Sequence, residues 1–479
     1  MRNAFQKQKY LHHLYLLFLS CYTFLSFFRH FTLQSGVYDL GLFTQWSYLA
    51  GIGKFWTPSS LTEFIKPALG DHFSLLLIPL GQFFRLLPSA YTLLFLQSAG
   101  LALLAILFLR ELFQSFSSRT SRRLITIGLL INPFLINSAL NDFHPEVAFA
   151  FLGFASLIFL RRKKYLVSAI LLILFVASKE AMAFFAIGYS IYSLLRRHFW
   201  LSAAVMVFAL YYFEFSSSIV DAYQSYASTR YGHLGSGYVD ILASPFIRPA
   251  DFWSAFINRD SLLYLLGLLT PFFALYRWPQ IIPAIVAAVP LVFANILSES
   301  DVMRNPIYQY QIPVLVFLML AALDSAKCPT SHPSQMFSLA RTRLYLASSV
   351  ISFFLLTQWS LFPTRYLQHL HLAPSLFRYE LKFHSPNLSV WAHERIAAHF
   401  SGRGEIFYRE QDLVDKEYDI LITPAVQLAQ APAGFLQKLR NLIFSYGASD
   451  EFTESINIVK VAESRGYKCR GSRVLVCEK

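Results

Sequence analysis

Charged side chains are scarce in this 479-residue sequence. Asp, Glu, Lys and Arg make up 14% of the residues, well below the roughly 25% of an average soluble domain. Hydrophobic residues reach 55%, with 47 Phe and 26 Tyr. This composition excludes an ordinary soluble protein. Apolar runs of about 20 residues recur along most of the chain and predict an α-helical polytopic membrane protein.

Other features are also missing. No small-residue cleavage site follows the first apolar run, so this run is expected to be a retained span rather than a signal peptide. The chain lacks a Gly-rich phosphate-binding loop, which argues against a soluble nucleotide-linked substrate. Only four cysteines are present. Cys469 and Cys477 flank a turn containing Gly471, and the sequence leaves open whether they form a disulfide.

Hydrophobic length predicts about eleven membrane spans. They cover residues 10–28, 90–110, 123–140, 146–160, 165–178, 181–195, 199–216, 261–276, 279–297, 307–323 and 344–360. The segment at 73–87 is too short for a span and contains Pro79 and Arg85, so a short membrane-surface or re-entrant helix is expected there. Residues 29–89 and 217–260 are then outer loops.

The charge distribution supports these spans, with the N-terminus in the cytoplasm. The predicted inner segments hold 17 of the 26 Lys and Arg residues before residue 361. Of the 15 acids in the same region, only Glu111 and Asp324 lie in inner segments. This region carries +11 of the net charge of +13, in turns that would face anionic lipid head groups. The lipid bilayer, and not nucleic acid, is therefore the expected partner.

The composition changes after the last predicted span. Residues 361–479 carry 15 Lys or Arg and 13 Asp or Glu. Helix-like and strand-like segments alternate there, among them HERIAAHF, EIFYR, YDILITP, GFLQKLRNLIF and SRVLVCE. Two domains are expected: a transmembrane domain over residues 1–360 and a small extracytoplasmic α/β domain over residues 361–479.

The predicted topology places a set of polar side chains on the outer face. They are Asp39 in YDLG, Asp71 and His72 in GDHFS, Asp142, His144 and Glu146 in NDFHPE, Lys179 and Glu180 in SKEA, and Arg304, Tyr308 and Tyr310 near the tenth span. Ionisable groups within the membrane region commonly mark a functional site. One outer-facing site is therefore predicted.

The NDFHPE segment has two interpretations. Asp142 and Glu146 suit the start of a helix, and His144 suits a hydrogen bond at the membrane interface. Alternatively, these three side chains hold a divalent metal or a metal-bound pyrophosphate, because carboxylates and imidazoles are ligands of such ions.

The remaining charged residues also have alternatives. Lys179 and Glu180 are adjacent and do not face each other on a helix. They either occupy a surface turn or line a cavity, where Lys179 would neutralise a phosphate leaving group and Glu180 would orient it. Asp39 either caps a helix or acts as a general base on an acceptor hydroxyl.

Five motifs together resemble a bacterial membrane-protein family known as domain of unknown function 2079. They are YDLGLFTQ at 38–45, DHFSLLLIP at 71–79, LLFLQSAGLAL at 93–103, NDFHPE at 141–146 and SKEA at 178–181. The family is similar to the GT-C class of polytopic glycosyltransferases. The sequence departs from the family pattern at Ala181, where an acid is common, and at YQYQIP (308–313), where the family has a His-Tyr element.

The resemblance implies a GT-C-like enzyme in the bacterial cytoplasmic membrane. It would transfer a sugar from a polyprenyl-phosphate donor to an envelope acceptor on the outer face. Asp39 would be the catalytic base, and Lys179, Arg304 or a metal near NDFHPE would stabilise the lipid-phosphate leaving group. Two other classes stay open: a transporter or flippase of lipid-linked or anionic substrates, and a non-catalytic envelope protein. The absence of an inverted repeat argues against a transporter.

Overall fold

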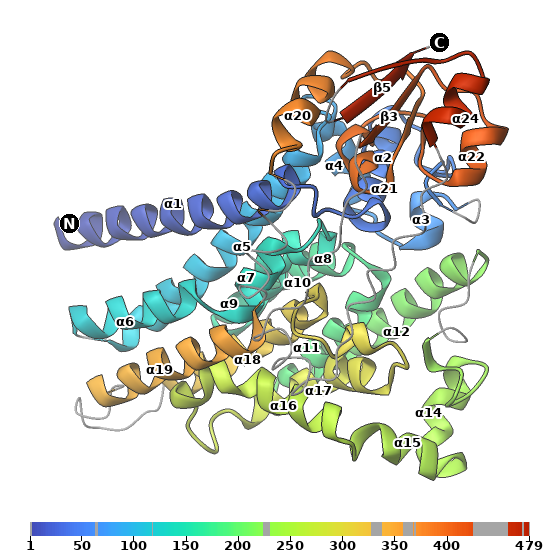
Figure 1. The fold of residues 1–479 in the computed structure, drawn as a ribbon. Helices are drawn as coiled ribbons and strands as arrows, with labels where there is room; N and C mark the ends of the chain where they lie inside the picture. The colour runs from blue at the N-terminus through green and yellow to red at the C-terminus, as the bar shows by residue number, and fades with distance from the viewer. Residues whose placement is uncertain are drawn as a thin grey trace.

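The computed structural model describes residues 2–62, 66–116, 118–223, 230–326, 338–357, 367, 370–424, 458–471 and 474–478. Helices dominate this part of the chain, and a small sheet lies at one end of the molecule, above the short helices α2, α3 and α4 (Figure 1). The fold is therefore a helical bundle with an α/β domain stacked on one of its ends.

Twelve of the described helices form the bundle. They are α1 (Arg2–Phe31), α5 (Ala90–Leu112), α6 (Arg119–Leu130), α7 (Pro133–Leu140), α9 (Ala150–Arg161), α10 (Tyr165–Val176), α11 (Ala183–Leu195), α12 (Phe199–Asp221), α16 (Arg259–Leu269), α17 (Ile282–Leu297), α18 (Ile312–Ala326) and α19 (Leu339–Leu356). Shorter elements connect them: η1 (Val37–Gly41), α2 (Leu42–Gly51), α3 (Ala68–Asp71), α4 (Leu77–Phe84), α8 (Pro145–Ala148), η3 (Glu180–Met182), α14 (Tyr238–Ile247), α15 (Pro249–Phe256), η4 (Thr270–Leu275) and η6 (Gln309–Gln311).

Five of the described helical segments are long and apolar enough to cross a membrane. They are Lys9–Phe31, Ala90–Ser115, Phe199–Asp221, Gln309–Ala326 and Leu339–Leu356, and the bent pair α6 and α7 makes a sixth if it counts as one span. Other predicted spans appear as shorter apolar helices, among them α9, α10 and α17. A mainly helical membrane protein is confirmed, while the number of eleven crossings stays a prediction.

The bend of 41° between α6 and α7 has a local cause. The Asn132 side-chain oxygen accepts a hydrogen bond from the Phe134 backbone N–H at 3.1 Å, and Pro133 is the first residue of α7. An Asn cap followed by Pro starts a new helix, because Pro cannot continue the hydrogen bonding of the previous one.

The segment at 73–87 contains the predicted short helix, α4, which packs against α2. The two helices approach most closely at Gly51 and Gly81. A Cβ atom on Gly51 would lie 2.6 Å from the Gly81 carbonyl oxygen, so the backbone contact requires glycine.

The two acids assigned to inner segments lie together with arginines assigned to the same side. Asp324 is 3.1 Å from Arg161 and also pairs with Arg196, and Glu111 pairs with Arg162. These pairs join the C-terminal ends of α5, α9, α11 and α18 at one end of the bundle. The NDFHPE segment precedes α9 and therefore lies toward the opposite end.

The C-terminal domain contains a five-stranded sheet in the order β2-β1-β3-β5-β4. Its strands are β1 (Val390–Ala392), β2 (Ile406–Phe407), β3 (Ile420–Pro424), β4 (Lys468–Arg470) and β5 (Val474–Glu478), and its described helices are α20 (Ala373–Lys382), α21 (Glu394–Phe400), α22 (Glu410–Asp415) and α24 (Ile458–Ser464). β1, β2 and β3 are parallel, and β5 is antiparallel to β3 and β4.

Most of the predicted C-terminal elements are confirmed. HERIAAHF contains α21, and EIFYR, YDILITP and SRVLVCE contain β2, β3 and β5. GFLQKLRNLIF lies outside the described residues. Cys469 and Cys477 form a disulfide between β4 and β5, which answers the question that the sequence left open.

The C-terminal domain and the loop after α1 share one hydrophobic core. Val37 of η1 belongs to the same buried cluster as Val390 of β1 and Val476 of β5. The Gln45 amide nitrogen of α2 also donates a hydrogen bond to the Gly404 carbonyl at 3.0 Å. The predicted outer loop 29–89 is thus folded against the domain.

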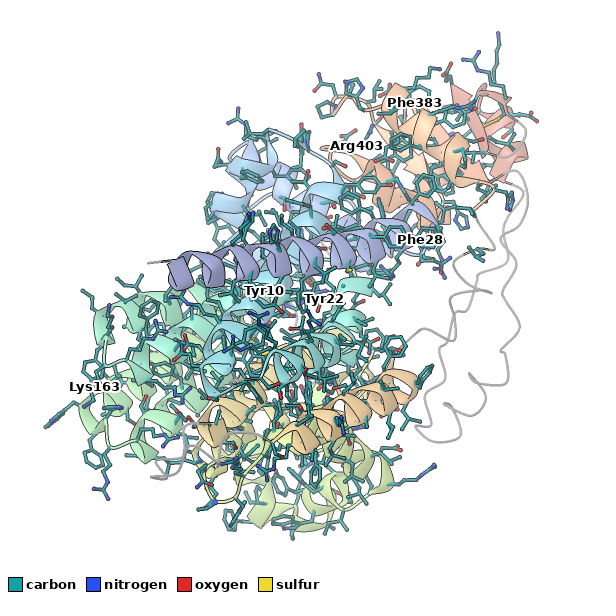
Figure 2. All side chains as sticks on the ribbon, turned by 90° about the vertical axis from the view of Figure 1, so that its left-hand side faces the viewer. Tyr10, Tyr22, Phe28, Lys163, Phe383 and Arg403 are labelled. Atoms are coloured by element: carbon teal, nitrogen blue, oxygen red, sulfur yellow. A yellow bond between two sulfur atoms is a disulfide. The ribbon has the colours of Figure 1, made fainter. Side chains whose placement is uncertain are left out.

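Arg403 links backbone segments of the C-terminal domain near this contact. It is buried, and its guanidinium donates to the carbonyl oxygens of Phe383 (2.7 Å) and Leu388 (3.0 Å). Figure 2 shows Arg403 and Phe383 in the domain, beyond the end of α1 where Phe28 lies.

Candidate functional site

Asp39 lies in η1, the turn that follows the loop after α1. Its neighbours Val37 and Leu40 are buried, while the Asp39 side chain is 48% exposed. Asp39 Oδ1 lies 3.4 Å from Nε2 of the buried His144. The first outer loop and the NDFHPE segment therefore meet, as the single predicted site requires.

Helix α5 holds the NDFHPE segment in place through Gln97. Its amide nitrogen donates to the carbonyl oxygens of Ser138 (2.9 Å) and Asp142 (3.2 Å), and its amide oxygen accepts from the His144 backbone N–H (2.8 Å). One turn further on, a Cβ atom on Gly100 would lie 1.9 Å from the Ala148 carbonyl oxygen. Helix α8 thus packs directly on the backbone of α5.

The surroundings of His144 define its tautomer. Nδ1 lies 3.0 Å from the Asp142 carbonyl oxygen, which only accepts, so Nδ1 carries a proton. Nε2 lies 2.8 Å from the Gln309 side-chain amide. When His144 is neutral, Nε2 accepts from this amide. Protonation sets Nε2–H against the Gln309 amide N–H, so Nε2–H donates to Asp39 only when the Gln309 amide turns away. The site thus accommodates two protonation states of His144.

The charges of Asp39 and His144 each favour the ionised form of the other group. Burial raises the pKa of Asp39, but the positive charges of His144, Lys179 and Arg29 together outweigh burial and hold this pKa below its ordinary value. Burial lowers the pKa of His144, but the carboxylates of Asp39 and Glu146 together outweigh burial and raise this pKa. The pair favours an ionised carboxylate beside a protonated imidazole.

Asp142 anchors the loop that leads to Asp39. One carboxylate oxygen accepts from the Gly36 backbone N–H at 2.8 Å, and the other pairs with Arg29 at the end of α1. The acid thus caps neither α8 nor α9. Sequence reasoning missed Arg29, because its position directly after a predicted span gives no sign of its partner.

Glu146 and Lys179 form a buried ion pair. Lys179 Nζ lies 2.9 Å from Glu146 Oε1, and their side chains are 8% and 3% exposed. Glu146 Oε2 has no hydrogen-bond partner among the described residues. Lys179 and Arg230 each lie 5.9 Å from the centre of the Tyr310 ring, which brings two cations to one aromatic side chain. Sequence reasoning missed Arg230, because nothing in the surrounding sequence distinguishes it from other outer basic residues.

Glu180 faces a different partner from Lys179. Its carboxylate lies 3.0 Å from His72 Nδ1 and accepts from the Phe73 backbone N–H at 2.9 Å. Burial raises the pKa of Glu180, but His72, Lys179 and a backbone hydrogen bond together outweigh burial, and the pKa falls to about 2. Asp71 lies 3.2 Å from Lys66 Nζ and 3.9 Å from His72 Nε2.

Phe43 joins the two groups of charges. This buried ring from α2 lies 6.5 Å from the His72 ring and 5.6 Å from the His144 ring. The acid–base cluster, as we name it, consists of Asp39, Asp71, Asp142, Glu146, Glu180, Arg29, Lys66, Lys179, Arg230, His72 and His144. Its five carboxylates face four permanent cations, so the two imidazoles decide the sign of its net charge.

Two further predicted binding residues, Arg304 and Tyr308, lie in the loop between α17 and α18. Arg304 donates to the carbonyl oxygens of Ile296 (2.9 Å) and Ser298 (2.8 Å) and pairs with Asp301, so it holds the loop between α17 and α18. Tyr308 precedes η6 and donates its backbone N–H to a carbonyl oxygen of the same loop.

The predicted metal ligands do not converge. Asp142 faces Arg29, Glu146 faces Lys179, and His144 faces Asp39. In the part of the chain that the structure describes, no group of three or more His, Cys, Asp or Glu side chains is arranged to hold a metal ion. Metal binding at these residues stays a prediction.

Comparison with solved structures identifies a similar fold. The crystal structure of ArnT from Cupriavidus metallidurans bound to undecaprenyl phosphate superimposes with a TM-score of 0.51 at 10% identity, over 96% of this chain and 97% of that chain. The structure of the same protein in the apo state gives 0.47 at 11% identity, over 92% and 93% of the two chains. At this identity the likeness to the first structure shows the fold alone, which is GT-C-like.

Comparison of sequences identifies the family. No curated protein matches the chain. The family described as "Predicted membrane protein (DUF2079)" matches residues 29–406, which include every residue of the acid–base cluster. The chain therefore belongs to the DUF2079 family of predicted membrane proteins.

Proposed function

We propose that this protein transfers a sugar from a polyprenyl-phosphate donor to a hydroxyl group of an envelope acceptor, on the outer face of the bacterial cytoplasmic membrane. The observation that carries the proposal is the half-exposed Asp39 carboxylate, paired with His144. The GT-C-like fold supports the proposal. The charge distribution supports a cytoplasmic N-terminus and an extracytoplasmic C-terminal domain.

Asp39 acts as the general base in this mechanism. It removes the proton of the acceptor hydroxyl, and the acceptor oxygen attacks the anomeric carbon of the donor sugar. The bond between this carbon and the phosphate oxygen breaks, and the electron pair leaves with the polyprenyl phosphate. Configuration at the anomeric carbon is inverted. The exposure of Asp39 admits the hydroxyl, and His144 keeps the carboxylate ionised.

Lys179 and Arg230 stabilise the leaving phosphate. Both cations adjoin Tyr310, and fixed positive charge lowers the barrier where negative charge develops. Lys179 is paired with Glu146, and Arg230, at the same aromatic ring, is a second cation beside it. Arg304 stays the predicted alternative. A divalent metal at Asp142, His144 or Glu146 would be an alternative source of this charge, but these side chains would have to leave their present partners to hold it.

Substitution of Asp39 by Asn tests the proposal. Transfer from radiolabelled polyprenyl-phosphate sugars into envelope glycans is expected to fall at least about 100-fold, because general-base catalysis contributes about 10²- to 10⁴-fold. The matched control is Asp240→Asn, an exposed acid in α14. Unchanged transfer in Asp39→Asn would refute the base. Loss of lipid flipping with transfer intact would indicate a transporter, and loss of transfer in EDTA would indicate the metal.

A further inference from the structure

Two stacked, buried histidines join α1 to the C-terminal domain. The ring of His30, near the end of α1, lies 3.8 Å from the ring of His399 in α21, and the two ring planes differ by 15°. His30 is 0% exposed and His399 is 8% exposed. Neither residue belongs to the acid–base cluster. The contact therefore places two titratable groups where a helix of the bundle meets the domain.

The groups around this pair can balance one positive charge. Nδ1 of His399 lies 3.3 Å from a carboxylate oxygen of Glu380 in α20, so Glu380 can balance a proton on His399. Both ring nitrogens of His30 and Nε2 of His399 have no hydrogen-bond partner among the described residues. Arg29, which precedes His30 in α1, is a permanent cation that pairs with Asp142. A proton on His30 would therefore lack a partner in the described part of the chain.

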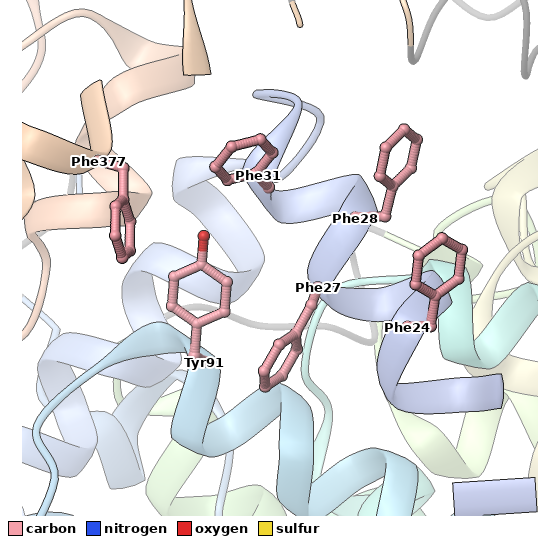
Figure 3. A pocket seen from close by; sticks show the side chains of 6 residues that line it. All are labelled: Phe24, Phe27, Phe28, Phe31, Tyr91 and Phe377. Carbon is pink, nitrogen blue, oxygen red and sulfur yellow. The ribbon is translucent and has the colours of Figure 1, made fainter. Parts of the chain in front are cut away.

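Aromatic side chains surround the same contact. The Tyr91 ring of α5 lies 4.8 Å from the His30 ring, and its phenol is neutral at physiological pH. Figure 3 shows Tyr91 among Phe27 and Phe31 of α1 and Phe377 of α20, which line an apolar groove with it. Burial in such surroundings disfavours the charged form of an imidazole.

The histidine pair is linked to the loop that carries Asp39. Ile396 lies about one turn before His399 in α21. Ile396 belongs to the same buried cluster as Val37 and Leu40 of η1. Movement of α21 away from α1 would therefore remove packing from residues on both sides of Asp39.

We propose that the stacked pair of His30 and His399 is a pH-sensitive switch, which holds α21 and the loop of Asp39 on the bundle near neutral pH and releases them in acid. In the closed contact His399 can take up a proton beside Glu380, and a second positive charge on the stacked ring is repelled.

The open form binds at least one more proton than the closed form. When α21 moves away, both imidazoles meet water, and each takes up a proton near pH 6.5. The closed contact is therefore at full strength above about pH 6.5 and weakens as pH falls below this value. This inference does not rest on the proposed transferase activity, because opening is measured without turnover.

Hydrogen–deuterium exchange of the full chain in detergent micelles tests the switch. Exchange of peptides from α21 is followed from about pH 8 to about pH 5 and corrected for the pH dependence of the chemical step. The opening equilibrium of α21 is expected to rise about tenfold for each pH unit below about 6.5, because one excluded proton has this effect. Peptides from α24, which belongs to a separate buried cluster, serve as the internal reference.

The variant His30→Phe removes the second proton. Phenylalanine keeps an aromatic ring against His399, and the change removes no hydrogen bond of the described structure. Exchange of α21 should stay as slow as in the parent near neutral pH and should lose its acid response. The matched control is His384→Phe, at an exposed position of the same domain, which should keep the full response.

Three results would overturn the proposal. They are an opening of α21 in the parent that does not change with pH, an undiminished acid response in His30→Phe, and an equal acid response of α24. The last result would indicate that the whole domain unfolds in acid. The first and the last are measured on the unsubstituted chain, so they do not depend on how the variant folds.

Discussion

At the scale of single residues, Asp39 and His144 link the charge of the site to pH. Charged Asp39 contributes stability above its ordinary pKa of 3.8, and the contribution disappears as pH falls through the lowered folded pKa. Charged His144 contributes stability below its ordinary pKa of 6.5, and the contribution disappears as pH rises through the raised folded pKa. The ion pair is therefore complete between the two folded pKa values.

Substitution of His144 by Gln should shift the acid limb of the pH–transfer profile. Burial still raises the pKa of Asp39 in this variant, while the main opposing charge is lost. Asp39 then takes up a proton at higher pH, and the acid limb of the pH–transfer profile should shift upward by about one pH unit or more, because such pairing typically changes a pKa by 1–3 units. The control is His384→Gln, at an exposed position. An unshifted limb would contradict the pairing.

The sequence predicts the identities of the site residues better than their partners. Asp39, His144, Lys179 and Glu180 were all recognised as outer polar residues, and the adjacent pair was expected to diverge. Their partners lie far away in sequence, and partner choice depends on how helices pack. Phe43, which contacts both imidazoles, is one of 47 phenylalanines and carries no local signal.

At the scale of elements, the contact of α5 with α8 positions the site. Gly100→Ala would place a Cβ atom against the Ala148 carbonyl, where the backbone cannot yield like a flexible side chain. We expect a loss of about 1–3 kcal/mol in the free energy of unfolding, as for other overpacked contacts. Transfer activity should fall as well, because α8 carries Glu146 and follows His144. Reversible unfolding in mixed micelles and transfer assays measure the two effects.

Gly267→Ala is the matched control for this prediction. Gly267 lies inside α16, and its added Cβ would make only ordinary contacts, 3.7 Å and 3.8 Å from the Leu356 side chain. Its stability should stay the same or rise by up to about 1 kcal/mol, because Ala favours helix more than Gly. Equal destabilisation of both variants would show that the close α5–α8 backbone contact does not cause the loss of stability in Gly100→Ala.

Helix breaks show which element boundaries are predictable. The start of α7 follows from Asn132 and Pro133, which are visible in the sequence. The division between α8 and α9 at Phe149 and the π-helical turn η1 carry no such signal. Their geometry follows from tertiary packing, as the hydrogen bonds of Gln97 illustrate.

At the scale of the whole molecule, the C-terminal domain supports the loop that follows α1. Hydrophobic residues of the two parts belong to one buried cluster. The Ser60 hydroxyl also donates to the Ile406 carbonyl at 2.7 Å and accepts from the Ile406 backbone N–H at 3.1 Å. The sequence predicted the strands of the domain, but not this partner, because loop and domain are separated by nearly the whole transmembrane region.

Deletion of residues 373–479 should therefore unfold the loop around Asp39. Trp46 is 1% exposed in the full chain and belongs to the shared core, so its protection should be lost when that core is removed. Limited chymotrypsin digestion in detergent micelles is expected to cut the truncated protein after Trp46 and leave the full chain intact there. Cleavage after the exposed Trp253, in both proteins, serves as the reference. Protection of Trp46 in the truncated protein would contradict the supporting role.

The shared core also determines when the site can assemble during synthesis of the chain. Val37 lies near the beginning of the chain, while its cluster includes Val474 and Val476 of β5. The ribosome therefore releases Asp39 and its loop long before the strand that completes their support exists. With the proposed topology, β5 must also cross the membrane before it can dock. A partly synthesised chain would hold the charged residues without an assembled site, so activity would begin only after translocation of the C-terminal domain.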